Sequence, residues 1–278
     1  MRLLVTGAGG GLGRAVLESI PPHHDVVAWT HEDLDVGDHH AVMRDVVPLS
    51  PDAILNCAAF TDVDGSEDDP RAAYRANAVG AQNLALAARA AWAMLLHVST
   101  DYVFDGAAGR PYDEVDEPRP LSVYGRSKLA GEAAVQRLLP ESFVVRTGYV
   151  FGGGRDYLTR AVRALARGEA AGAIGDRTGT PTNVRDLASS VVSLLFTRRF
   201  GMYHLAGPEP ATWHEVLDRA RRLGDLSGRV ESQRSKDLRL RAPRPSYSAL
   251  TSIFAADAGV ALTRSLDDAI VDFLGRAL

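Results

Sequence analysis

Short apolar runs alternate with amphipathic stretches along the first half of the chain. Each run is bounded by turn residues and predicts a strand; the runs are Leu3–Thr6, Val26–Trp29, Ala53–Cys57, Met94–Ser99 and Phe143–Arg146. The stretches between them predict helices near Gly11–Ser19, His39–Val47, Pro70–Trp92 and Val123–Leu139. Continuous apolar strands separated by helices are typical of a parallel sheet covered on both faces. The pattern therefore predicts an α/β fold with a Rossmann-like, doubly wound parallel sheet.

After about Gly152 this alternation becomes less regular. Further helices are predicted near Asp156–Arg167, Val184–Thr197, Thr212–Leu223 and Leu266–Leu278, with a short strand near Met202–Leu205. No internal repeat or low-complexity linker separates the two halves. We expect residues 1–150 to form the sheet domain. Residues 151–278 are expected to form mainly a small C-terminal lobe, with some segments returning to the sheet domain.

The composition is that of an ordinary globular protein and excludes several function classes. The 278 residues are 46% hydrophobic and 24% charged, with a net charge of −4, whereas nucleic-acid binders usually present a strongly basic face. The single cysteine, Cys57, cannot form a disulfide or a thiolate metal cluster within the chain and suits a reducing compartment. The apolar runs are too short for a signal peptide or a membrane span. We expect a cytoplasmic protein with neither nucleic acid nor membrane among its partners.

Basic residues are unevenly used. Arg accounts for 29 of the 31, and Lys occurs at Lys128 and Lys236 alone. The segment Arg219–Pro245 holds nine basic residues against three acidic ones. Such a segment is either a solvated surface or a region near an anionic ligand, and the sequence leaves both explanations open.

A glycine-rich turn follows the first predicted strand and opens the first predicted helix. Glycines at positions 7, 10 and 13 form a Gly-x-x-Gly-x-x-Gly pattern, which is a spacing variant of the dinucleotide-binding fingerprint. Glycine permits the tight turn and lets the backbone approach a pyrophosphate at the positive end of the helix. The turn predicts a nucleotide site that includes Gly7, Gly10, Gly11, Leu12 and Gly13.

The end of the second predicted strand bears on which dinucleotide is used. An acid there would bond the adenosine ribose of NAD, whereas a cationic or hydroxyl-bearing loop accommodates the 2′-phosphate of NADP. This strand continues with Thr30 and His31 and has no acid at its tip. NADP(H) is therefore favoured, but Asp33 could reach the ribose and NAD(H) is possible. Asp35 and Val36 suit the rim of an adenine pocket.

Three side chains that suit proton exchange with a sugar follow the fourth predicted strand and open the next helix. Thr100 comes at the carboxyl end of that strand, where chemistry is sited in an open α/β sheet. Tyr124 and Lys128 are four residues apart and share a helix face. Because a nearby cation favours an ionised phenol, we expect Lys128 to lower the pKa of Tyr124. A phenol tuned in this way can exchange a proton with a sugar oxygen.

These motifs are similar to those of the extended short-chain dehydrogenases/reductases, and the chain most resembles the dTDP-4-dehydrorhamnose reductase family. The segments that carry the resemblance are Val5–Gly13, Leu34–Val36, Asn56–Asp64, Asn77–Ala78, Ser99–Gly106, Tyr124–Lys128, Arg146–Val150, Gly179–Thr182 and Arg244–Pro245. The resemblance implies that NAD(P)H reduces a nucleotide-linked 4-keto-6-deoxysugar, most closely dTDP-4-dehydro-L-rhamnose to dTDP-L-rhamnose. It also implies that the N-terminal domain binds NAD(P) and that the C-terminal lobe binds the substrate.

The same resemblance implies roles for individual residues. Tyr124 would donate a proton to the C4 oxygen, Lys128 would hold the nicotinamide ribose, and Thr100 would polarise the carbonyl. Positions that match the lining of the sugar pocket are Thr100, Asp101, Tyr102 and Tyr149. Positions that match residues near the cofactor are Ala58, Ala59, Thr61 and Asn77. The two alanines could equally be small packing residues, and the asparagine could be an ordinary helix residue.

Three departures limit what the resemblance implies. Tyr149 stands where the family often has a Trp that stacks on the sugar. Some members dimerise through Mg²⁺ held in part by an acid of the first helix, where this chain has Ala15. We therefore expect no metal, and a homodimer remains possible by other contacts. The chain reads Ser246-Tyr247-Ser248 where the family tends to show an Asn-Ser pair, so no C-terminal substrate contact is transferred.

Two other function classes remain open on the sequence. A sugar-nucleotide epimerase or dehydratase would retain NAD, but in dehydratases an Asp-Glu pair typically follows the Thr, whereas here Asp101 precedes Tyr102. A non-catalytic subunit is the other class, because the regulatory subunit of methionine adenosyltransferase is similar to these reductases. Thr100, Tyr124 and Lys128 together favour the reductase. The sequence does not determine the exact sugar, the nucleotide or the oligomeric state.

Overall fold

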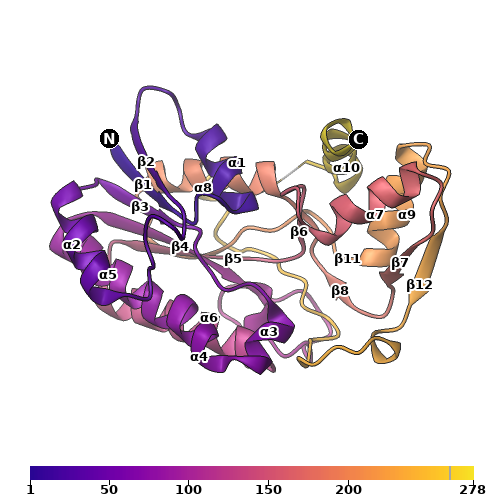
Figure 1. The fold of residues 1–278 in the computed structure, drawn as a ribbon, viewed down its shortest axis with the longest axis horizontal. Helices are drawn as coiled ribbons and strands as arrows, with labels where there is room; N and C mark the ends of the chain where they lie inside the picture. The colour runs from indigo at the N-terminus through magenta and orange to yellow at the C-terminus, as the bar shows by residue number, and fades with distance from the viewer. Residues whose placement is uncertain (263) are drawn as a thin grey trace.

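Six parallel strands form the central sheet of the protein (Figure 1). The computed structural model describes residues 1–262 and 264–278, and the strands lie in the order β10-β5-β4-β3-β1-β2. Their bounds are β1 Arg2–Thr6, β2 Asp25–Trp29, β3 Ala53–Asn56, β4 Met94–Thr100, β5 Ser142–Thr147 and β10 Gly201–His204. The five pairings between neighbours are parallel. The predicted doubly wound α/β fold is confirmed, and the strands lie where the apolar runs predict them.

Helices cover both faces of this sheet, since successive strand residues point to opposite sides. Leu3 and Val5 of β1 belong to the core shared with α1 and α8, whereas Leu4 belongs to the core on the other face. The first face is covered by α1 (Gly11–Ser19) and α8 (Val184–Thr197). The second face is covered by α2 (His39–Leu49), α5 (Gly80–Ala90) and α6 (Val123–Leu138). Burial on both faces explains why the inner strands β1, β3, β4 and β5 are apolar at most positions, whereas the edge strand β2 is partly exposed.

The longest predicted helix contains an irregular turn. Asp69 caps α4 (Pro70–Tyr74), as a residue before Pro at a helix start commonly does. A π-helical turn over Arg75–Val79 then leads into α5. The helix ends at Ala90 rather than at Trp92, which is 95% exposed and has φ of 57°. Turns of this kind are frequent at functional sites, and nothing in the apolar pattern predicts this one.

A second apolar core is formed by segments that follow residue 150. Its helices are α7 (Tyr157–Ala166), α9 (Trp213–Leu223) and α10 (Leu266–Ala277). Short strands pair beside them: β7 (Ala171–Ile174) with β12 (Val230–Gln233), β8 (Thr178–Gly179) with β11 (Ala211–Thr212), and β6 (Val150–Phe151) with β9 (Thr182–Asn183). The sequence predicts the three helices but none of these six strands, because segments of two to four residues are too short to show a period.

The chain passes several times between the sheet, which has a core on each face, and this second group of helices with its own core. The helix α8 packs against α1, and β10 pairs with the edge of the sheet at β5. Figure 1 shows the segment after β12 running back toward the sheet, where Leu250 forms a β-bridge with Tyr112. The remaining elements are α3 (Val63–Asp68) and the 3₁₀ turns Asp101–Val103 and Ser235–Asp237. Residues that pack on the α1/α8 face of the sheet and residues of the second core consequently meet around one cavity.

Candidate active site

The glycine turn after β1 is packed tightly against neighbouring backbone. Gly7 has φ of 69°, and a Cβ added to it would lie 2.5 Å from the amide nitrogen of Ala58. A Cβ added to Gly13 would lie 2.3 Å from the carbonyl oxygen of Gly7. Real Cβ atoms do not approach backbone so closely, so glycine is required for this packing of β1, α1 and the segment after β3.

The amino-terminal end of α1 is suited to a pyrophosphate. Its N-cap is Gly10, so no side chain caps the free amides, and its first turn contains no acid. Free N–H groups and the helix dipole both favour an anion at such an end. These residues therefore fit the dinucleotide that the glycine motif predicts.

A cavity of about 660 Å³ adjoins this turn, and we call it the dinucleotide cavity. The predicted residues that line it are Gly7, Gly10, Thr30, His31, Asp35, Val36, Ala58 and Ala59. Glu32 and Arg155 line it as well. Sequence reasoning missed both, because neither belongs to a recognisable motif.

Acids near the end of β2 are engaged by the protein itself. The carboxylate of Asp33 accepts hydrogen bonds from the amide and the hydroxyl of Thr30, both at 2.8 Å, and Asp33 does not line the dinucleotide cavity. Asp35 pairs with Arg75 at 2.6 Å, and the guanidinium lowers the pKa of Asp35. An Asp held in this way is a weaker partner for a ribose hydroxyl than a free one.

A second cavity of about 630 Å³ shares Gly10, Cys57 and Ala59 with the first, and we call it the tyrosine cavity. The predicted residues that line it are Gly10, Gly11, Leu12, Gly13, Ala59, Thr61, Thr100, Asp101, Tyr102, Tyr124, Lys128 and Tyr149. With the exception of Asn77, every predicted site residue lines one of the two cavities. Residues separated by up to 142 positions in the chain are thus brought together.

Lys128 is buried between α6 and β4. Its side chain is 2% exposed, and its Nζ donates a hydrogen bond to the carbonyl oxygen of Val98 at 2.7 Å. Burial lowers the pKa of Lys128 to about 8, while the carboxylate of Glu132, one helical turn later, opposes that fall. Lys128 is therefore a cation below about pH 8 and lines the cavity beside Tyr124.

The expected lowering of the pKa of Tyr124 is wrong. Burial raises this pKa above that of a free phenol, and the negative charge of Asp101 raises it further, while Thr100 offsets part of the rise. The ammonium group of Lys128 is engaged by the β4 backbone instead. Desolvation of a phenolate therefore outweighs the neighbouring lysine. Tyr124 is a neutral phenol at physiological pH, which is the form that donates a proton.

Thr100 and Asp101 form a polar pair at the carboxyl end of β4. The Oγ of Thr100 donates to Oδ1 of Asp101 at 3.1 Å and accepts from the amide of Tyr102 at 3.2 Å. Ser248 donates to the other carboxylate oxygen of Asp101 at 2.5 Å. Burial raises the pKa of Asp101 to about 6. The contact with Ser248 joins positions 147 residues apart, and sequence reasoning transferred no contact to that C-terminal segment.

Aromatic side chains form one wall of the tyrosine cavity. Tyr149, with φ of 47°, stacks on Trp213 with ring centroids 4.9 Å apart and parallel planes. Tyr157 meets Trp213 edge-on, with centroids 5.5 Å apart. All three line the cavity and present flat apolar surface next to polar groups. Trp213 begins α9 of the second core, and no sequence signal connects it with a site.

Asn77 lines neither of the two cavities. It is fully buried, and its amide exchanges hydrogen bonds of 2.9 and 3.1 Å with the backbone of Phe60. It also donates to Oγ of Ser127 at 2.9 Å. Through these hydrogen bonds Asn77 fastens the segment after β3 to α6. It positions the helix that carries Tyr124 and Lys128.

A buried ion pair holds α6 against the sheet one turn beyond Lys128. Glu132 of α6 and Arg146 of β5 bond at 2.7 Å, with side chains 1% and 3% exposed. Ser99 donates to Glu132 at 2.5 Å. The guanidinium of Arg146 also approaches Nε2 of His204 at 3.4 Å and lies 5.1 Å from the ring centre of Phe104.

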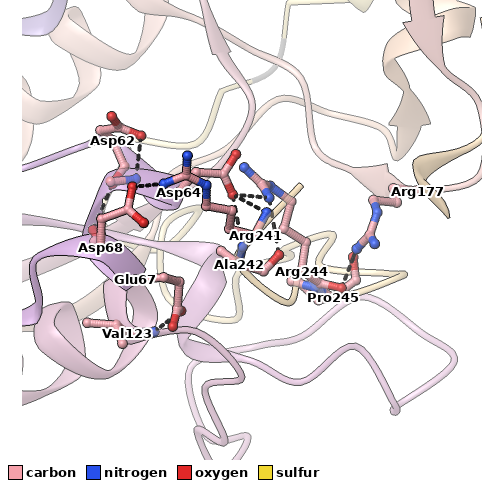
Figure 2. Close-up of polar contacts among 12 residues, drawn as sticks. Asp62, Asp64, Glu67, Asp68, Val123, Arg177, Arg241, Ala242, Arg244 and Pro245 are labelled. Atoms are coloured by element: carbon pink, nitrogen blue, oxygen red, sulfur yellow. Dashed lines mark hydrogen bonds and ion pairs between the residues drawn. The ribbon is translucent and has the colours of Figure 1, made fainter. Parts of the chain in front are cut away.

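Arg244 brings the basic C-terminal segment to the edge of the cavity. Figure 2 shows Arg244 paired with Asp64 of α3, at 2.8 Å, while Arg177 bonds the backbone of the same segment. The charges of Arg244 and Arg177 partly offset the burial that raises the pKa of Tyr102 to about 12. One end of Arg219–Pro245 thus lies next to the cavity-lining Tyr102.

Within residues 1–262 and 264–278, no group of three or more His, Cys, Asp and Glu side chains is placed to hold a metal ion. Across those same ranges, no helix has the length and apolar character needed to span a membrane.

Comparison with known proteins identifies the family. The model of the RmlD substrate binding domain matches residues 1–277. A dTDP-4-dehydrorhamnose reductase of Mycobacterium tuberculosis is 40% identical over 98% of this chain and 92% of its own length. A dTDP-4-keto-6-deoxy-D-glucose reductase of Streptomyces niveus is 38% identical over 90% of this chain and 88% of its own. The crystal structure of dTDP-4-dehydrorhamnose reductase from Bacillus anthracis in complex with NADP superposes with a TM-score of 0.94, at 31% identity over 98% of both chains. The predicted resemblance is confirmed, and the chain belongs to the RmlD substrate binding domain family.

Proposed function

We propose that this protein uses NAD(P)H to reduce a nucleotide-linked 4-keto-6-deoxysugar, most closely dTDP-4-dehydro-L-rhamnose to dTDP-L-rhamnose. One observation carries the proposal. Thr100, Tyr124 and Lys128 line a single cavity that adjoins the cavity at the glycine turn. A proton donor and a dinucleotide site thus share one space, as carbonyl reduction requires.

Tyr124 is the proposed proton donor to the C4 oxygen. Its raised pKa keeps the phenol protonated until negative charge develops on the sugar oxygen beside it. Proton donation by a positioned side chain contributes typically 10²–10⁴ in rate. Thr100 polarises the same carbonyl, and Lys128 of α6 supplies a positive charge at the cavity wall.

The proposed dinucleotide site follows the two cavities. The pyrophosphate is held by Gly7, Gly10, Gly11, Leu12 and Gly13. The dinucleotide also contacts the small residues Ala58, Ala59 and Thr61. Asp35 and Val36 border the adenine. Thr30 and His31 accommodate the 2′-phosphate, and Lys128 holds the nicotinamide ribose. When bound, the nicotinamide supplies a hydride to the sugar. NADP(H) is favoured because the relative from Bacillus anthracis was solved with NADP and because Asp35 is already paired with Arg75.

The substrate site follows from the walls of the tyrosine cavity. Asp101 and Tyr102 offer hydrogen bonds to the sugar, and Tyr149 stacks on it with Trp213 behind. We assign cofactor binding to residues 1–150 together with α8 and β10, and substrate binding mainly to the rest of residues 151–278. The relatives act on different 4-keto sugars by name, so the sugar itself is decided by assay.

Two alternatives have less support. A dehydratase needs a second acid beside Asp101, but the next residue, Tyr102, has a pKa raised to about 12. An epimerase shares the fold, and a UDP-glucose 4-epimerase of Thermus thermophilus superposes with a TM-score of 0.84, but at 23% identity that likeness concerns architecture alone. A non-catalytic subunit would have no use for the convergence of Thr100, Tyr124 and Lys128.

The deciding experiment mixes the purified protein with dTDP-4-dehydro-L-rhamnose and either NADPH or NADH. The expected result is loss of reduced-nicotinamide absorbance in proportion to product, faster with NADPH. Product formed without net oxidation, with cofactor released only on denaturation, would indicate an epimerase. Binding of the cofactor without turnover of any 4-keto sugar would indicate a subunit. Repeating the assay with dTDP-4-keto-6-deoxy-D-glucose distinguishes the two sugars that the relatives' names suggest.

Location and assembly complete the proposal. We place the protein in the cytoplasm, where reduced nicotinamide cofactors and nucleotide sugars are available and where a free thiol such as Cys57 stays reduced. A homodimer is compatible with this function and is tested by light scattering on the same preparation.

A further inference from the structure

Asp101 is a buried carboxyl group beside the proposed proton donor. It is 3% exposed and lines the tyrosine cavity with Thr100 and Tyr124. A Cβ added to Gly148 would lie 2.7 Å from Cγ of Asp101, so the loop after β5 packs directly on the carboxyl group. The other buried acid of this region, Glu132, is paired with an arginine. Within the described residues, Asp101 has hydroxyl groups rather than a cation as its side-chain partners.

Both oxygens of Asp101 have a defined partner. Oδ1 lies 3.1 Å from Oγ of Thr100, and Oδ2 accepts the hydroxyl of Ser248 at 2.5 Å. Ser248 is itself 1% exposed and belongs to the segment that returns from the C-terminal lobe. The carboxyl group is therefore held in one orientation by the neighbouring Thr100 and by Ser248 from a distant part of the chain.

The hydrogen-bonding capacity of Thr100 distinguishes the two protonation states of Asp101. A hydroxyl group has one proton to donate and two lone pairs. One lone pair of Thr100 accepts the amide of Tyr102 at 3.2 Å. If Asp101 is ionised, it takes the single proton of Thr100, and none is left for Tyr124 or for a carbonyl. If Asp101 is protonated, it donates to the second lone pair, and the proton of Thr100 is free.

We propose that Asp101 is a proton reserve that reloads Tyr124 through the hydroxyl of Thr100, and that Ser248 positions it. The proposal rests on the proposed function. The Oη–H bond of Tyr124 breaks as its proton goes to the sugar oxygen, whose carbon has received the hydride of the reduced nicotinamide. The proton of Thr100 then passes to Oη of Tyr124, and the proton of Asp101 passes to Oγ of Thr100. Asp101 is left as a carboxylate and takes a proton from water entering the cavity.

The surroundings of Asp101 allow both of its states near neutral pH. The titratable groups that face it are Tyr102 of the 3₁₀ turn, Tyr124 of α6 and Tyr149 after β5, all of which feel its charge. Two cations, Arg177 and Arg244, lie beyond them and act on Tyr102 and Tyr149.

Burial raises the pKa of Asp101 to about 6, and the hydrogen bonds from Ser248 and Thr100 limit the rise. A carboxyl group of this acidity passes a proton to a tyrosinate readily and regains one from water.

The test measures kcat against pH for the wild type and three variants. For the wild type, kcat falls as the pH rises through the pKa of Asp101, because the reserve is then empty. Asp101→Asn keeps the shape and still donates a hydrogen bond to Thr100, but it has no proton to pass on. We expect its kcat to be at least about tenfold lower and the alkaline fall to be absent.

Ser248→Ala separates this mechanism from a structural role. Losing one hydrogen bond to the carboxylate raises the pKa of Asp101, so the alkaline fall moves to higher pH. Ser246→Ala, an exposed position two residues earlier, leaves the profile in place. An active wild type whose alkaline fall survives in Asp101→Asn, or stays unmoved in Ser248→Ala, overturns the proton reserve alone. If Asp101→Asn does not fold, the two serine variants decide. A wild type without reductase activity overturns the proposed function and the reserve with it.

Discussion

Arg146→Met probes the buried ion pair that holds α6 under the tyrosine cavity. The substitution leaves the carboxylate of Glu132, 1% exposed, without its cation and with the hydroxyl of Ser99 as a remaining partner. Removing one partner of a buried pair typically costs about 3–5 kcal/mol, since an uncompensated charge stays inside. At roughly 2–4 °C per kcal/mol for a protein of this size, we expect the Tm to fall by ~6–20 °C. Circular dichroism during heating and urea titration measures both quantities.

A second variant separates lost charge pairing from lost packing. In Arg146→Met combined with Glu132→Leu, neither charge of the pair is left buried, so the double variant should be more stable than Arg146→Met alone. Arg229→Met removes a cation from an exposed pair, in which Arg229 is 79% exposed, and should leave the Tm unchanged within error. The reasoning fails if Arg146→Met costs less than about 1 kcal/mol, or if the double variant is the less stable of the two.

Three further outcomes are expected. Tyr124→Phe should lower kcat by about 10²–10⁴ while leaving the Kd for NADPH within a few-fold in a fluorescence titration, and near wild-type turnover would remove Tyr124 from the mechanism. Gly13→Ala should weaken NADPH binding and lower the Tm, because its Cβ would lie 2.3 Å from a backbone oxygen, whereas Gly275→Ala, with no heavy atom within 4 Å of the added Cβ, should do neither. Cys57 lines both cavities, but it should resist iodoacetamide at pH 8 until the protein is unfolded, because desolvation raises the pKa of its thiol to about 12 and leaves little thiolate; rapid labelling of the folded protein would contradict this.

The inner part of the central sheet could be predicted because β1, β3, β4 and β5 are buried on both faces. Such strands are apolar almost throughout, so their positions are visible without knowledge of their neighbours. The same holds for the glycine turn, where backbone crowding at Gly7 and Gly13 admits no side chain. The π-helical turn is different, because the amide of Asn77 is oriented by contacts with Phe60 and Ser127 that lie far along the chain.

The candidate site was predictable only where its residues share a local element. Tyr124 and Lys128 are found by their spacing on α6, and Thr100 by its place after a strand. Trp213 and Ser248 reach the cavity and its acid through the return of distant segments, and spacing along the chain gives no sign of this. The wrong expectation for the pKa of Tyr124 has the same origin. The sequence shows a neighbouring cation but not the desolvation that outweighs it.

A ribosome completes β1 to β5 well before α8, which covers one face of the sheet that those strands build. Leu3 and Val5 share their core cluster with Leu187 and Val191 of α8. Until α8 has emerged, α1 alone covers this face of the nascent sheet and part of its aliphatic surface stays exposed, and surfaces of this kind attract chaperones or aggregate. A chain truncated near residue 150 would therefore be an aggregation-prone fragment rather than a stable cofactor-binding domain. Synthesis must therefore continue through α8 before this face of the sheet is protected from aggregation.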